Sequence, residues 1–201
     1  MIKTVMIVGQ KWLAAEVLKL CLKLSLNIAQ VAVPTRNDRL ADQAACFDIP
    51  IVYIVKKLTE EEVPHGIDLL ICAHAHCFIT DGARNKTKLG AIGYHPSLLP
   101  RHRGRDAVRW AIHMGEQITG GTVYWLNDKA DAGEIAAQDW CWVRPDDTPD
   151  ILWRRELAPM GLKLFERVLN DLISGQLVKI RQDESLMTFE PSFHTKTMKD
   201  A

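Results

Sequence analysis

The sequence has no surplus of charge of either sign. Of its 201 residues, 25 are Lys or Arg and 25 are Asp or Glu, so the formal net charge is zero at pH 7. Proteins that gather nucleic acid through electrostatics carry a basic surface. The charge balance therefore argues against DNA as a partner.

Long hydrophobic runs and a framework of paired cysteines are also missing. No stretch approaches the roughly twenty apolar residues of a membrane helix, and the apolar run at residues 5–8 is too short for a secretory signal. The five cysteines are odd in number and irregularly spaced, which fits reduced thiols better than disulfides. We therefore expect a cytoplasmic protein that does not engage a membrane.

Short apolar runs alternate with helical patterns in the first half of the chain. Strands are predicted at residues 2–8, 28–33, 51–55, 68–73 and 90–94, with helices at 12–24 and 38–47. This alternation predicts a Rossmann-like α/β fold, an open and mostly parallel sheet with helices on both faces. Ligands of such sheets bind beyond the carboxyl ends of the strands.

The second half of the chain changes pattern. A helix is predicted at 106–114, and β-rich segments at 119–126 and 135–143 favour a hairpin. The longest helical pattern covers 148–174, with a kink expected at Pro159. From residue 175 onward we expect a short strand near 185–189 and then a loosely ordered tail.

The first strand leads into the turn Gly9, Gln10, Lys11 and Trp12. Amides at the start of a helix can bind an anion, but a dinucleotide fingerprint requires three glycines and only one is present. A nicotinamide cofactor is therefore not expected. The segment is either a plain tight turn or a contact with substrate.

Cys72, His74 and His76 alternate with alanines, so on an extended strand they would share one face. Two imidazoles and a thiol can ligate zinc. No fourth ligand or glutamate base stands nearby, and a histidine on a buried strand is more often a hydrogen-bonded core residue. We expect no metal.

Two other residues have the setting of a catalytic pair. His95 follows a strand directly and is stiffened by Pro96 and the rigid turn at residues 98–100, the kind of placement that a general acid or base requires. Asp131 lies in the polar loop at 127–133, and a carboxylate beside an imidazole can orient it. Each also has a plain alternative, a loop cap for His95 and a turn former for Asp131.

A local basic cluster follows His95. It either holds an anionic group or pairs with neighbouring acids. Its members are Arg101, His102, Arg103, Arg105 and Arg109.

Two motifs resemble the folate-dependent formyltransferase family, which includes glycinamide ribonucleotide, methionyl-tRNA and amino-sugar formyltransferases. The first is HPSLLP at residues 95–100, followed by Arg103 and Gly104. The second is the strand-loop-strand that runs from the GGTVYW segment at 120–125 to the DAGEI segment at 131–135. The resemblance covers residues 2–175 and implies a catalytic domain at 1–176 with a short extension at 177–201.

The resemblance also implies roles for individual residues. His95 and Asp131 match the family's catalytic His and Asp, and 10-formyltetrahydrofolate is the implied formyl donor. The catalytic Asn of the family falls at Gly93, which has no side-chain donor for an oxyanion. We expect a backbone amide, a water or a hydroxyl such as Tyr94 or Thr122 to replace it. The implied folate pocket comprises His76, Cys77, Phe78 and Ile79, with Asn127 and Asp128 as a second wall.

The resemblance predicts an N-formyltransferase that acts on a small amine, such as an amino sugar nucleotide or an amino-acid derivative. A tRNA substrate is disfavoured by the neutral charge and by the roughly 25 residues that remain after the family region. We expect the first turn (Gly9, Gln10, Lys11, Trp12) and Arg103 to contact the acceptor. A formyltetrahydrofolate hydrolase and a catalytically weak folate-binding protein remain alternatives, and a homodimer is left open.

Overall fold

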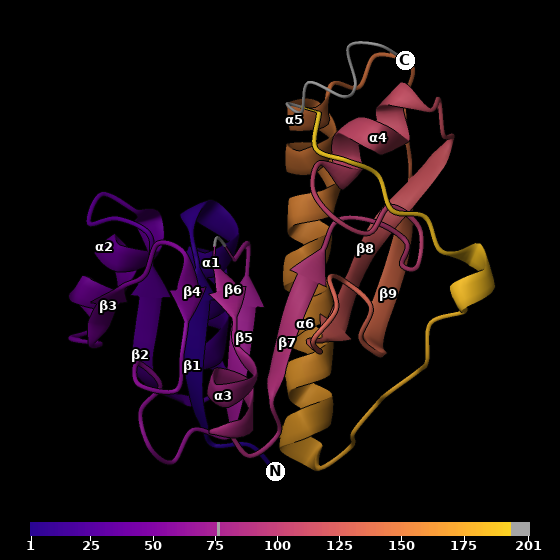
Figure 1. The fold of residues 1–201 in the computed structure, drawn as a ribbon. Helices are drawn as coiled ribbons and strands as arrows, with labels where there is room; N and C mark the ends of the chain where they lie inside the picture. Colours follow the sequence, from indigo (N-terminus) through magenta and orange to yellow (C-terminus); the bar gives the residue numbers. More distant parts are fainter. Residues whose placement is uncertain (76, 194–201) are drawn as a thin grey trace.

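The computed structural model describes residues 1–75 and 77–193. A seven-stranded sheet forms its centre, in the order β3-β2-β1-β5-β7-β8-β9 (Figure 1). The strands are β1 (Thr4–Gly9), β2 (Asn27–Val33), β3 (Ile51–Tyr53), β5 (Leu69–Ala73), β7 (Ala91–His95), β8 (Ile118–Trp125) and β9 (Ile135–Trp142). The strands from β3 to β7 pair in parallel, and β8 and β9 pair antiparallel to their neighbours. The predicted α/β fold and the hairpin are confirmed.

The central strand β1 shows why the sheet is covered on both faces. Val5 and Ile7 belong to one apolar cluster, and Met6 and Val8 belong to a second. Because successive side chains of a strand point to opposite faces, a run without polar residues must be buried on both. The apolar segment at residues 5–8 therefore predicts a central parallel strand.

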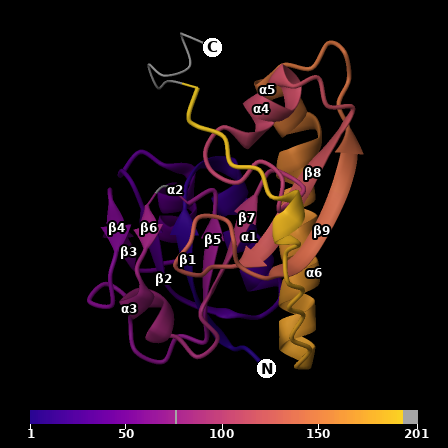
Figure 2. The ribbon, with the colours of Figure 1, turned by 45° about the vertical axis from the view of Figure 1, so that its right-hand side comes forward.

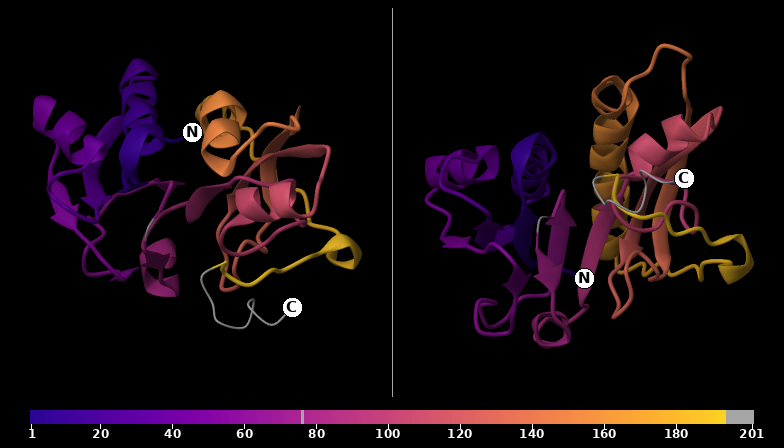
Figure 3. Two further views of the ribbon diagram at one scale, coloured as in Figure 1. Left: turned by 90° about the horizontal axis from the view of Figure 1, so that it is seen from above. Right: turned by 45° about the horizontal axis from the view of Figure 1, so that its top comes forward.

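Helices cover one face of the sheet, and a smaller layer covers the other. The first cluster includes residues of α1 (Lys11–Lys23), α2 (Arg39–Cys46) and α6 (Ala158–Ser174). The second lies under the short strands β4 (Lys57–Leu58) and β6 (Phe78–Ile79) and helix α3 (Asp81–Asn85). Seen from above, the long α6 stands beside the β7–β9 half of the sheet (Figure 3).

The predicted helix at 148–174 is interrupted before Pro159. It begins as α5 (Pro149–Leu152), widens into a π-helix at Trp153–Leu157 and continues as α6. Because proline cannot donate a backbone hydrogen bond, a wider turn ahead of it relieves the helix. The π-helix places Trp153 among the residues that line the large cleft described below.

The predicted strand at 185–189 is wrong. Residues 184–186 form a 3₁₀ helix, and only Phe189 makes a β-bridge, to Arg103. Residues 177–193 are also not loose, because they return along β9 toward α4 (Ala107–His113), as the yellow segment of Figure 2 shows. The rest of the predicted tail, 194–201, lies outside the described residues. Of the helices in the described residues, none is long and apolar enough to cross a membrane.

A buried thiol predicts how stability depends on pH. Cys21 of α1 is fully buried, and this burial raises its pKa from 9.0 to about 12. The folded state therefore keeps a proton that the unfolded state loses above pH 9, so this contribution to stability is present below pH 9 and declines between pH 9 and 12.

Replacement of this thiol removes the pH-dependent contribution. Cys21→Ala leaves a small cavity at every pH, but its deficit in unfolding free energy should shrink by about 1 kcal/mol between pH 8 and pH 10. Urea titrations at the two pH values measure the difference. Cys46→Ala, which removes an exposed thiol, is the control. A constant deficit for Cys21→Ala would contradict the assignment.

Candidate functional site

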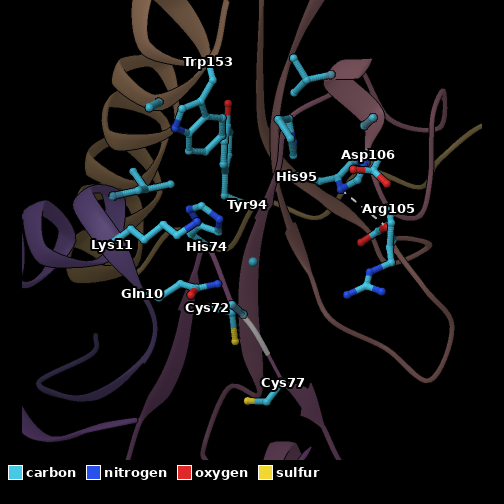
Figure 4. Close-up of a pocket in the computed structure, with 18 of the residues that line it drawn as sticks. Gln10, Lys11, Cys72, His74, Cys77, Tyr94, His95, Arg105, Asp106 and Trp153 are labelled. Carbon is cyan, nitrogen blue, oxygen red and sulfur yellow. Dashed lines mark ion pairs between the residues drawn. The ribbon is translucent and has the colours of Figure 1, made fainter. Parts of the chain in front are cut away.

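A cleft of about 1620 Å³ opens at the carboxyl ends of β1, β5 and β7. This is the place where the strand order reverses, since β2 and β5 lie on opposite sides of β1. One wall carries the first turn (Gln10, Lys11) and His74, and the opposite wall carries His95 with Arg105 and Asp106 (Figure 4). Trp153 closes the far end. The cleft is large enough for two small molecules side by side.

His95 is the last residue of β7 and is only 7% exposed. Its Nε2 lies 2.6 Å from the backbone carbonyl oxygen of His102. A carbonyl accepts but cannot donate, so Nε2 carries a proton and donates it. In the neutral form of the ring the lone pair therefore lies on Nδ1. This nitrogen faces Asp131, and the distance from His95 Nδ1 to Asp131 Oδ2 is 3.6 Å.

Asp131 is fixed from two sides. Its Oδ1 accepts a hydrogen bond from the Tyr124 hydroxyl (2.6 Å), and its Oδ2 accepts one from the Gly104 amide (2.7 Å). Burial, together with the nearby Asp131 charge, raises the pKa of the Tyr124 hydroxyl well above its usual value, so the phenol remains a donor. The carboxylate is thus held next to His95 by groups that cannot lose their protons at neutral pH.

Gly93 lies opposite Tyr124 in the β7–β8 register. A Cβ atom at Gly93 would lie 2.8 Å from Leu126 Cδ1 and 3.5 Å from the Tyr124 ring. The space that a longer side chain would require is therefore filled by these two residues of β8 and its continuation. The ring of Tyr124 thus packs next to Gly93, and its hydroxyl donates to Asp131.

The two hydroxyls expected to replace the missing amide are engaged elsewhere. Tyr94 donates to the carbonyl oxygen of Leu157 in the π-helix (2.7 Å). Thr122 donates to the Ser97 carbonyl and accepts hydrogen bonds from Leu99 and Gln138, so it holds the HPSLLP turn together. The prediction for Tyr94 and Thr122 is wrong, because strand alternation directs Tyr94 to the α6 face and Thr122 under the turn.

The first turn does line the cleft, through Gln10, Lys11 and Trp12. The first amide of its helix is engaged, because both carboxylate oxygens of Asp38 accept from the Lys11 amide, at 2.9 and 3.1 Å. Asp38 also caps α2 through the Leu40 amide (2.8 Å). Gly9, which was expected to contact the acceptor, is not among the residues that line the cleft, and a Cβ there would lie 2.0 Å from the Ala73 carbonyl oxygen.

The expected folate segments lie mostly where the resemblance implied. Cys77, Phe78, Ile79 and Asn127 line the cleft, whereas Asp128 does not. His76 lies outside the described residues. Burial raises the pKa of the Cys77 thiol to about 11, so it is neutral in the cleft wall.

Arg103 was expected to contact substrate, and the structure contradicts this. Its side chain is buried away from the cleft and pairs with Gln182 and Glu184 of the extension. Within the basic cluster, Arg101 pairs with Glu116, and His102 lies between Glu116 (3.0 Å) and Glu190 (3.2 Å). Arg105 and Arg109 are the members that line the cleft.

The strand that would have aligned Cys72 with the two histidines ends at Ala73. His74 follows with φ of 54° and packs edge-on against Trp153, at 5.3 Å between ring centroids. Among the described residues, no group of three His, Cys, Asp or Glu side chains is placed to hold a metal.

Three residues at the site escaped sequence reasoning: Tyr124, Gly104 and Gln182. Tyr124 precedes Asp131 by seven residues on a strand whose alternation shows which face it occupies, and Gly104 was noted only as part of a motif. Gln182 donates to the backbone carbonyl of Asp131 from 51 residues away. No local pattern indicates such a contact.

A family profile described as formyl transferase matches residues 2–169. The cytosolic 10-formyltetrahydrofolate dehydrogenase of Xenopus laevis is 30% identical over 198 residues, which cover 92% of this chain and 22% of that protein. The methionyl-tRNA formyltransferase of Lactobacillus delbrueckii subsp. bulgaricus is 29% identical over 205 residues, which cover 94% of this chain and 64% of that protein. The chain thus spans about a fifth of the first and two thirds of the second.

Solved structures share the fold. An N-formyltransferase from Helicobacter canadensis, in complex with folinic acid and dTDP-3-aminofucose, superposes with a TM-score of 0.77 at 21% identity, over 94% of this chain and 71% of that chain. A phosphoribosylglycinamide formyltransferase from Anaplasma phagocytophilum gives 0.75 at 23% identity, over 94% and 99%.

The hydrogen bonds of Asp38 to the Lys11 and Leu40 amides predict its contribution to stability. Asp38→Ala removes the α2 cap and the partner of the Lys11 amide and should lower the unfolding free energy by about 1–2 kcal/mol. Asp38→Asn keeps a side-chain oxygen and should lose less than half as much. Urea denaturation measures both, and an unchanged stability of Asp38→Ala would contradict the role assigned to the carboxylate.

Proposed function

Because the chain belongs to the formyl transferase family, we propose that it binds 10-formyltetrahydrofolate in the main cleft and moves the formyl group to the amine of a small molecule. One observation carries the proposal. His95 and Asp131 are 36 residues apart in sequence, yet their side chains come within 3.6 Å at the edge of this cleft. Both match the catalytic positions that the resemblance to the family implies.

The hydrogen bond of His95 Nε2 supports a role in proton transfer for the neutral imidazole. With the proton on Nε2, its Nδ1 lone pair and the Asp131 carboxylate face each other without a donor between them. Two acceptors in this arrangement attract an N–H or O–H group. An incoming amine therefore has a place to leave its proton, and the carboxylate stabilises the imidazolium that results.

The reaction follows from this arrangement. The amine nitrogen attacks the formyl carbon, the carbonyl oxygen becomes an oxyanion, and the amine proton passes to His95 Nδ1. The bond from the formyl carbon to N10 of the folate then breaks, and the same proton passes to N10. Gly93 offers no side-chain donor, so the positive charge of the imidazolium is the main stabiliser of the oxyanion.

Features of the opposite wall bear on the acceptor. Asp38 already accepts from the Lys11 amide of the first turn, which disfavours an acceptor whose phosphate would bind that amide. Trp12, His74 and Trp153 offer an aromatic surface beside it. Together with the neutral net charge, these features favour a small amine, such as an amino sugar nucleotide or an amino-acid derivative, over tRNA.

Hydrolysis is the second candidate. The Xenopus laevis relative at 30% identity is named for 10-formyltetrahydrofolate itself and for no amine acceptor. A water molecule that donates to Nδ1 would meet the same catalytic pair. In that case the products are formate and tetrahydrofolate.

Two substitutions test the catalytic pair. His95→Ala and Asp131→Asn should each lower the rate of tetrahydrofolate release by about 100-fold or more, because the proton acceptor or its counter-charge is lost. Steady-state absorbance with 10-formyltetrahydrofolate and the amine that gives turnover in the panel described below measures the rate, and calorimetry with 5-formyltetrahydrofolate measures binding. His65→Ala, an exposed histidine, is the control. Full activity of either site variant would overturn the assignment.

The two candidate reactions separate in one assay. Incubation with 10-formyltetrahydrofolate alone should release little formate, whereas a panel of amino sugar nucleotides and amino acids should include one that accelerates turnover. Stoichiometric formate that no amine diverts would instead establish hydrolysis. Binding of folate with no turnover in either arm would identify a binding protein.

A further inference from the structure

The extension beyond residue 176 makes specific bonds to the loops that carry the catalytic pair. Ile180 pairs with Ile135 at the start of β9, and the Thr188 carbonyl accepts from the Arg103 amide (3.0 Å). The Trp110 side chain donates to the Pro191 carbonyl (2.9 Å). Figure 2 shows this segment in yellow, alongside the β8–β9 hairpin. It therefore passes behind the wall of the cleft that holds His95.

Gln182 is the centre of these contacts. Its side-chain amide donates to the carbonyl oxygens of Asp131 (2.8 Å) and Gly133 (2.7 Å), and its oxygen accepts from Arg103 Nη2 (2.7 Å) and Nε (3.1 Å). Both N–H groups and the oxygen are therefore used. A side chain with this arrangement is fixed at each end.

The contacts of Gln182 link the two segments that surround the Asp131 carboxylate. Arg103 is followed by Gly104, whose amide donates to Asp131 Oδ2. The segment 103–104 and the loop 131–133 are thus joined twice, once directly and once through Gln182. Glu184 also accepts from the Arg103 guanidinium, from Nη2 at 2.7 Å and from Nη1 at 3.1 Å.

The backbone of Asp131 requires such support. Its φ is 51°, in the left-handed region that costs an L-residue roughly 1 kcal/mol or more. Bonds to the carbonyls of residues 131 and 133 fix the peptide planes that follow this strained residue. A shift there would move the carboxylate relative to His95, and a misplacement of about 1 Å can reduce a rate by about 100-fold.

We infer that Gln182 is a positioning residue, which completes the active site by holding Asp131 at its distance from His95. The inference rests on the proposed function for its kinetic consequence. The structural part, that Gln182 keeps Gly104 and Asp131 together, stands independently of the reaction. The domain boundary at residue 176 that the resemblance implied therefore separates Gln182 from the Asp131 loop that it holds.

Three variants of the whole chain test the inference. Gln182→Glu keeps an acceptor for Arg103 but places oxygen against the two carbonyls, so it should break the contact with the Asp131 loop alone. Gln182→Met removes both contacts. Ser185→Ala, on the same segment but bonded only to Asp183, is the matched control.

The kinetic readout distinguishes positioning from general stability. Gln182→Glu should lower kcat by about 10- to 100-fold, with KM for the folate changed less than threefold and the melting temperature within a few degrees. Ser185→Ala should match the wild type. If kcat of Gln182→Glu stays within twofold of the wild type, or falls only with the folded fraction, the inference is wrong.

Amide hydrogen exchange separates failure of the inference from failure of the proposed function. Exchange of the Gly104 amide, which Asp131 holds, should accelerate by tenfold or more in Gln182→Glu and remain slow in Ser185→Ala. This readout applies even if the wild type proves inactive. Unchanged protection of Gly104 would overturn the inference whatever the enzyme does.

Discussion

The carboxylate of Asp131 is the constraint on which the site depends. It lies in a loop outside the regular sheet, in a left-handed backbone conformation, and is held by Tyr124 from β8 and by the amide of Gly104. Strand β7 brings His95 to the same point. A partly buried carboxylate without these donors would be costly, so its hydrogen bonds both stabilise the loop and set its position relative to His95.

Much of the fold follows from local patterns. The apolar run in β1 predicts burial on both faces, and the alternation of strands and helices predicts the parallel half of the sheet. Proline at 159 predicts an irregular helix, and the irregularity takes the form of a π-turn just before it. The extension was misjudged, because its order derives from contacts with residues about 50 to 90 positions away rather than from its own pattern.

The candidate site was predictable in part for the same reason. His95 and Asp131 belong to motifs that are recognisable in the sequence. Their proximity in space agrees with the prediction that they form a catalytic pair. Arg103 was misassigned because a basic residue beside a motif has the same local signature whether it binds substrate or an internal acid. The bond from the Lys11 amide to Asp38 and the contacts of Gln182 left no signal, since they join residues 27 or more positions apart.

The chain compensates in two ways for the glycine at position 93. Leu126 and the ring of Tyr124 fill the space, which keeps the cleft wall closed. The Tyr124 hydroxyl adds a neutral donor to the catalytic carboxylate, and burial keeps it protonated. In the proposed reaction, stabilisation of the oxyanion then depends on the His95 imidazolium and hence on how accurately Asp131 is held.

A crystal structure with 5-formyltetrahydrofolate and a candidate amine would show whether the formyl group of the folate lies beside His95 and Asp131. The account predicts the pteridine along residues 77–79, with the formyl-bearing end of the folate within about 4 Å of His95 Nδ1 and Asp131 Oδ2. A folate seated elsewhere, or one whose formyl group lies far from both side chains, would contradict it.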